Sequence, residues 1–64
     1  MNDLKISLTA ARVNAGLTQK ELAEKVGKSE GTIINWEKNP SNIRFHDLKK
    51  LCDVLKINID NIFF

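Results

Sequence analysis

The side chains of this 64-residue chain that can perform acid–base, nucleophilic or metal chemistry are few and isolated. His46 is the only histidine and Cys52 is the only cysteine. One cysteine excludes an internal disulfide, and the two residues together are too small a ligand set for a structural zinc site. His46 has no partner at catalytic spacing, and Cys52 at a core position is interpreted as a small buried hydrophobe rather than a redox group. We therefore expect no enzyme activity, metal, cofactor or small-molecule substrate.

The length and charge of the chain favour one small domain that can bind a polyanion. Sixty-four residues make one domain at most, residues 1–64. Ten Lys and Arg residues against eight Asp and Glu residues give a net charge of +2, which permits a nucleic-acid partner without demanding one. No apolar run can span a bilayer, and the N-terminus lacks the order of a signal peptide. We expect a cytoplasmic protein with no membrane partner.

The elements that must position any functional side chain are predicted to be helices. Apolar residues recur at intervals of three and four instead of alternating, which is typical of helices. Gly16, Gly27 and the segment 39–42 interrupt this periodicity. The pieces between them predict five helices: about 4–15, about 19–26, one from Ser29 to Asn39, one with the core positions Leu48, Leu51, Cys52 and Leu55, and a short last helix. The expected fold is all-α and compact.

The two terminal helices have weaker boundary signals than the others. Asp3 and Ser7 are both suitable caps for the first helix. Its inward face is expected to consist of Leu8, Ala11 and Ala15. The last helix is expected to be capped by Asn58 and to pack inward through Ile59 and Phe63.

The strongest local signal precedes the second helix. Thr18 followed three residues later by Glu21 predicts a capping box, in which each side chain accepts a hydrogen bond from the other residue's backbone N–H. Leu17 and Leu22 occupy the positions of a hydrophobic staple. Gly27 then supplies the positive φ of a tight turn.

The third helix is expected to present a polar face. Ser29 is a good N-cap, Ile33 and Trp36 face inward, and Thr32 and Asn35 face outward. We interpret Trp36 as a core residue rather than a base-stacking one. Two helices joined by a short turn with glycine form a helix-turn-helix, whose second helix fits the major groove of B-DNA.

Two longer segments carry a more specific resemblance. "ARVNAGLTQKELAEKVGKSEGTIINWEKNP" resembles the lambda-repressor/Cro-type (XRE-like) helix-turn-helix family, and "FHDLKKLCDVLKINIDNIFF" resembles the last two helices of that family. The resemblance extends from about Leu8 to Phe63, with the helix-turn-helix at about residues 18–38. It implies a five-helix, lambda-repressor-like domain that acts as a sequence-specific transcriptional regulator, similar to a phage Cro protein or a minimal repressor.

The resemblance also implies contacts with the DNA backbone. Gln19 matches a glutamine that holds a phosphate at the start of the second helix; the alternative is a solvated side chain. Arg12 and Glu37 match positions that pair between the first and third helices and orient the reading helix; the alternative is two independent surface charges. Further phosphate contacts, or a plain solvated loop, are expected at Ser41, Asn42 and Arg44.

The positions that match base-reading residues lie at the start and outer face of the third helix: Lys28, Ser29, Glu30, Gly31, Thr32 and Asn35. Asn35 can bond bidentately to adenine, and Lys28 can reach guanine or a phosphate. The sequence departs here from the family's more usual Gln, Arg and Ser. Gly31 has no side chain to read with but allows close backbone approach, and Glu30 either accepts from cytosine or merely stabilises its own helix.

The expected partner is a double-stranded DNA operator, which a homodimer would bind as two half-sites about 34 Å apart. An apolar patch at Phe63 or Phe64 is a candidate dimer or partner interface. The alternative function is a protein-binding modulator, anti-repressor-like, that pairs with another repressor. Glu30 and the weak net charge motivate it, because an acidic tip suits a basic protein better than a polyanion.

Overall fold

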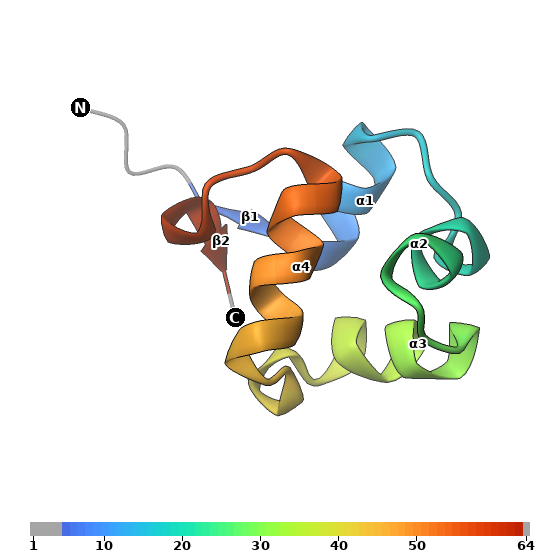
Figure 1. The fold of residues 1–64 in the computed structure, drawn as a ribbon. Coiled ribbons are helices and arrows are strands. Elements are labelled where there is room, and N and C mark those ends of the chain that lie inside the picture. The colour runs from blue at the N-terminus through green and yellow to red at the C-terminus, as the bar shows by residue number, and fades with distance from the viewer. Residues whose placement is uncertain (1–4, 64) are drawn as a thin grey trace.

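A computed structural model of the protein describes residues 5–63, without the side chain of Phe63. The described elements are, in chain order, β1 (Ile6–Ser7), α1 (Leu8–Asn14), α2 (Gln19–Val26), α3 (Glu30–Lys38), the 3-10 turn η1 (Pro40–Asn42), α4 (Phe45–Leu55), the 3-10 turn η2 (Ile59–Asn61) and β2 (Ile62–Phe63) (Figure 1). The mostly helical character is confirmed. The count of five helices is wrong, because the described range contains four α-helices.

The expected fifth helix is replaced by η2 and β2. The Asn58 side chain does act as a cap, but it accepts from the Asp60 N–H at 2.9 Å and closes a tight turn. Ile62 is already extended and pairs with Ile6 in a parallel two-stranded sheet. A helix through Ile62 is incompatible with this pairing, because its backbone groups bond to the neighbouring strand instead of to a helical turn. Pairing with β1 instead satisfies the backbone of Ile62 and buries its side chain.

The first helix begins at Leu8, later than the pattern predicted. Ile6 and Ser7 are extended, and Ser7 caps α1 by accepting from the Ala10 N–H at 3.0 Å. Asp3, the other candidate cap, lies outside the described residues. At the far end Ala15 is an exposed C-cap residue, so its expected place on the core face is wrong. The chain turns there through Gly16, with φ of +76°.

The helix α2 forms as its local signals predict. The Thr18 hydroxyl accepts from the Glu21 N–H at 3.0 Å, and the Glu21 carboxylate accepts from the Thr18 N–H at 2.8 Å. Leu22 is fully buried, and Leu17 packs against the core. Gly27 ends the helix with φ of +74°, which glycine adopts without a Cβ clash. The capping box and the turn therefore set where α2 starts and stops.

The helix α3 is held with its apolar side against the core. Ser29 caps its start, and Asn39, which precedes Pro40, follows its last residue. Ile33 is fully buried and Trp36 is 7% exposed, which confirms that the indole packs in the core. Glu30, Asn35 and Lys38 consequently face outward, whereas the Glu37 side chain is largely buried.

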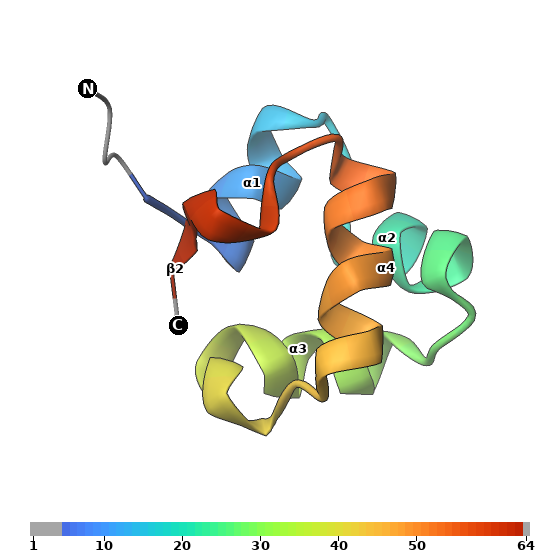
Figure 2. The ribbon, with the colours of Figure 1, turned by 60° about the vertical axis from the view of Figure 1, so that its left-hand side comes forward.

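The core joins α2, α3 and α4 into one unit. The apolar face predicted for α4 is buried at Leu48, Leu51, Cys52 and Leu55. α2 packs against both α3 and α4, and Figure 2 shows α4 beside α2 with α3 along the lower edge. No helix among residues 5–63 is both long and apolar enough to cross a membrane.

Candidate nucleic-acid interface

The outward side of α3 is an exposed polar surface on a well-supported helix. In Figure 1 α3 runs along one edge of the molecule. Glu30, Gly31 and Asn35 are exposed on it, whereas Ile33 and Trp36 face the core. An α-helix with its side chains is about 10–12 Å wide, which matches the roughly 12 Å width of the major groove. The geometry of α3 is therefore compatible with insertion into that groove.

The hydroxyl groups at the start of α3 are engaged with each other. The Ser29 Oγ accepts from the Thr32 N–H at 3.2 Å and lies 2.9 Å from the Thr32 Oγ. Ser29 therefore serves first as the helix cap. A base contact by either hydroxyl would have to form in addition to the hydrogen bond between the two hydroxyl groups, or replace it. The half-buried Thr32 still presents part of its side chain to the surface.

Gly31 is not required by the packing of the protein itself. A Cβ placed on this residue would meet only the Ser29 Oγ, at 3.9 Å, and the backbone of Gly31 is ordinary helix rather than left-handed. Glycine weakens a helix relative to alanine. Its presence here is thus explained by neither space nor backbone conformation within the chain.

The exposed Asn35 retains the groups needed to recognise adenine. Its Oδ1 accepts a long hydrogen bond, 3.3 Å, from the Asn39 Nδ2. The Nδ2 group of Asn35 remains free to donate, and the oxygen has a second lone pair. Bidentate bonding to adenine needs one donor and one acceptor on the same amide. Asn35 offers both from the surface of α3.

The structure brings Arg12 and Glu37 together in an ion pair between α1 and α3. The Arg12 Nε lies 2.6 Å from Glu37 Oε2, and their side chains are only 14% and 7% exposed. Arg12 also donates to the Leu17 carbonyl at 2.9 Å, which ties down the loop before α2. Burial acts to raise the pKa of Glu37, but hydrogen bonds from Arg12, Gln19 and Thr9, with the Arg12 charge, lower this pKa overall.

Gln19 belongs to the same cluster. Its Nε2 donates to Glu37 Oε1 at 2.9 Å, so one amide N–H is used inside the protein and the amide still has a second N–H to donate. This contact fixes the orientation of the amide at the N-terminus of α2. This contact is not predictable from the sequence, because 18 positions separate the two residues and no local pattern links them.

Lys28 is paired with a residue of α4 that the sequence analysis did not single out. Its Nζ lies 3.6 Å from Asp47 Oδ1, and Asp47 Oδ1 also lies 3.4 Å from His46 Nε2. In the sequence Asp47 has the appearance of an acidic residue in the first turn of a helix, which is favourable for the helix dipole alone. No spacing rule relates it to Lys28.

The other expected contact residues lie along the loop that follows α3. Ser41 and Asn42 are exposed in η1, which contacts α3. Arg44 is exposed at the N-cap position of α4, where its side chain makes no capping hydrogen bond. The backbone of Phe63 forms β2 together with Ile62, whereas the Phe63 side chain and all of Phe64 lie outside the described residues.

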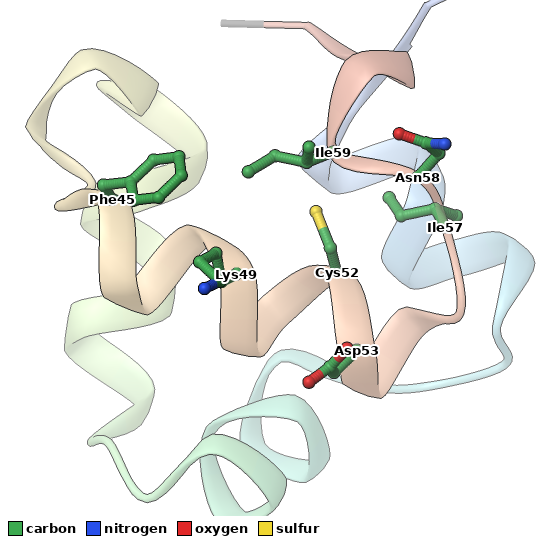
Figure 3. Close-up of a pocket in the computed structure, with 7 residues that line it drawn as sticks. All are labelled: Phe45, Lys49, Cys52, Asp53, Ile57, Asn58 and Ile59. Carbon is green, nitrogen blue, oxygen red and sulfur yellow. The ribbon is translucent and has the colours of Figure 1, made fainter.

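A shallow pocket of about 320 Å³ opens between α4 and the segment before η2. Its lining, drawn in Figure 3, consists of Phe45, Lys49, Cys52, Asp53, Ile57, Asn58 and Ile59. The Cys52 sulfur points toward the side of the pocket formed by the two isoleucines. Burial, with the neighbouring carboxylate, raises the pKa of the Cys52 thiol, which makes it a poor nucleophile. Across residues 5–63 no three metal-ligating side chains gather. The lining of the pocket is mainly apolar.

Comparison with known proteins places this arrangement in a family. A helix-turn-helix family model matches residues 8–62. Antitoxin HipB from Escherichia coli strain K12 is 34% identical over 53 residues, which cover 83% of this chain and 60% of that relative. Antitoxin HipB from Escherichia coli O6:H1 strain CFT073 is also 34% identical over 53 residues, covering 83% of this chain and 56% of its own length. No solved structure matches the chain.

The chain therefore spans little more than half the length of these curated relatives. The family model, by contrast, covers nearly the whole chain and includes every element from α1 to Ile62. The chain therefore belongs to the XRE-type helix-turn-helix family, the class of the lambda repressor and Cro.

Proposed function

We propose that residues 1–64 act as one DNA-binding domain of a cytoplasmic, sequence-specific transcriptional regulator of the Cro or repressor type, as in small phage regulators. The observation that carries this proposal is the outward face of α3. This helix is capped by Ser29 and anchored through Trp36, and Glu37 ties it to α1, so its polar side chains project as a fixed surface. Rigid presentation of a helix face is what major-groove reading requires.

In this proposal the residues of α3 differ in the contacts that they can make with the bases. Asn35 supplies the amide that recognises adenine, and Thr32 supplies a hydroxyl or methyl contact. Gly31 allows the helix backbone to approach the DNA closely. Lys28, Ser29 and Glu30 complete the reading positions; Glu30 is compatible with a cytosine amino group and disfavours nearby phosphates.

Phosphate contacts from the start of α2 and from the loop after α3 would set the register. Gln19 lies at the start of α2, and the loop after α3 supplies Ser41, Asn42 and Arg44. Such contacts position the protein without carrying sequence information. A homodimer would place two copies of α3 about 34 Å apart on a palindromic operator.

The test is binding to random duplex DNA, followed by selection of preferred sequences from a random library. A DNA reader should bind any duplex weakly, with an affinity that falls steeply as salt rises. The selection should then enrich one motif, and Asn35→Ala should relax the preference at one base pair of it. Absence of binding to any duplex at low salt would reject the proposed function.

Glu30 favours a second candidate function, that of a protein-binding modulator. Its carboxylate is exposed in the first turn of α3, where a DNA reader would place donors. Both curated relatives are named antitoxins, and a toxin or another repressor would be a partner of suitable class. Under this candidate the reading face of α3 is matched to a basic protein surface.

The substitution Glu30→Lys separates the two candidates. It should strengthen binding to random duplex DNA in either case, because it removes a negative charge and adds a positive one. Only the protein-binding candidate predicts that the same variant loses binding to a basic partner. If Glu30→Lys strengthened both complexes, the second candidate would be rejected.

A further inference from the structure

The ion pair of Lys28 and Asp47 joins the turn before α3 to the first turn of α4. The Lys28 Nζ lies 3.6 Å from the Asp47 Oδ1. The Asp47 side chain is only 12% exposed, whereas the Lys28 side chain is 39% exposed. The carboxylate is thus fixed in a packed helix, while the ammonium stands at the end of a long, flexible side chain near the reading surface.

We propose that Asp47 is an internal counter-ion that withholds Lys28 from DNA phosphates and so helps to determine the specificity of the protein. This inference rests on the proposed DNA-binding function. Asp47 touches neither base nor phosphate in this role. It is a positioning residue that acts through Lys28.

Lys28 leaves the Asp47 carboxylate behind when it moves to DNA. If its ammonium swings to a phosphate, the largely buried Asp47 carboxylate loses its closest lysine partner, and unpairing a buried charge is unfavourable. An ion pair between Lys28 and a solvent-exposed phosphate is little more favourable than the Lys28–Asp47 pair that it replaces. A guanine edge, with two acceptors in fixed positions, competes better. Asp47 therefore reduces sequence-independent binding more than binding to a suitable site.

The contributions of other basic side chains near the turn must be separated from that of Lys28. His46 brings its Nε2 to 3.4 Å from Asp47 Oδ1, and its side chain is 75% exposed. Lys50 extends from α4 so that its Nζ lies 3.9 Å from the place that a Cβ on Gly27 would take. Removing the Asp47 charge raises the local positive potential around all of these groups. A test must show that Lys28 in particular is released.

The experiment measures the salt dependence of binding to random duplex DNA for Asp47→Asn and for the wild type. One additional phosphate contact steepens the log–log slope by about 0.9, which is an extra loss of roughly threefold in affinity between 50 and 200 mM salt. We expect this steeper slope, tighter binding to random duplex at low salt, and a smaller ratio of specific to random binding. Asp47→Glu should restore the wild-type slope.

The matched control is Asp53→Asn, which makes the same charge change at an exposed position of α4. It should leave the slope unchanged. The Asp47→Asn effect should also vanish in a Lys28→Met background; if it persists there, the added charge acts through other groups and the inference is overturned. Thermal unfolding of each variant identifies any that fails to fold.

The single variant Lys28→Met gives an independent check in the otherwise native chain. Because Lys28 is withheld from phosphates, this variant should keep the wild-type salt slope on random duplex; a slope shallower by about 0.9 would overturn the inference. Absence of wild-type binding would instead reject the proposed function itself. The two failures are therefore distinguishable.

Discussion

Arg12 on α1 and Glu37 on α3 form a largely buried ion pair, with the Arg12 Nε 2.6 Å from the Glu37 Oε2. The same carboxylate accepts from Gln19, so one anion links α1, α2 and α3. Such a pair fixes orientation, and breaking it by removing one partner is costly. We predict that Glu37→Gln lowers the free energy of unfolding at pH 7 by about 2 kcal/mol.

The pH dependence of this loss has a definite sign. The folded-state pKa of Glu37 lies below its ordinary value of 4.5. Its stabilisation is therefore present above that pH and disappears as the pH falls through the folded-state pKa. Urea unfolding at a series of pH values should show the wild type and Glu37→Gln converging in acid. Glu24→Gln removes an exposed carboxylate of α2 and should show little effect at any pH.

Arg44 occupies an N-cap position without acting as a cap. Its backbone has the extended conformation of an N-cap, φ −73° and ψ 153°, yet its side chain makes no capping bond. Arg44→Ser should therefore stabilise the protein by about 1 kcal/mol, or about 5 °C in the midpoint of thermal unfolding. The same change should weaken DNA binding and make its salt slope shallower by about 0.9. Arg44→Ala should share the DNA effect but not the stabilisation; equal stabilities would contradict the capping argument.

The parts of the fold that sequence reasoning predicted are those with local causes. The capping box joins Thr18 to Glu21, which lie within one helical turn of each other. The turn after α2 depends on Gly27 itself. Both signals are therefore visible in the sequence. The pairing of Ile6 with Ile62 joins the two ends of the chain, and no periodicity reveals it. The same residue types suit a helix or a strand, and this long-range pairing decides between them.

The candidate site shows the same division. Helical periodicity placed Asn35 outward, and family resemblance pointed to Arg12 and Glu37, whose side chains do meet. The partner of Lys28 remained hidden, because Asp47 comes from another helix and its approach depends on how α4 packs beside the turn. Contacts of this kind follow from tertiary packing rather than from spacing.

Cys52 should react slowly in the folded protein. The residue is 5% exposed, and burial, together with the Asp53 carboxylate, raises the pKa of its thiol above the ordinary value of 9.0. Since the thiolate is the reactive form, alkylation by iodoacetamide at pH 8 should be at least about tenfold slower than in urea. Mass spectrometry over time measures both rates. Equal rates would show that the core around α4 opens readily.

Gly31 gives the sharpest test of how closely α3 approaches its partner. A Cβ at this position meets nothing closer than the Ser29 Oγ at 3.9 Å, so Gly31→Ala creates no clash within the protein. Alanine is the better helix former, and we predict a gain of about 0.5–1 kcal/mol in the free energy of unfolding. The contrasting control is Gly16→Ala, which should destabilise because Gly16 has φ of +76°.

If α3 inserts into the major groove, the methyl group of Gly31→Ala occupies space that the DNA needs. Affinity for the selected operator should then fall by about tenfold, the scale of one unfavourable base-pair contact. The Gly31→Ala variant should thus have a higher midpoint of thermal unfolding and a lower affinity for the operator, and both are measured on the same preparation. A variant that is both more stable and equally tight on DNA would show that the start of α3 does not lie against the bases, and the reading surface would have to be placed nearer Asn35.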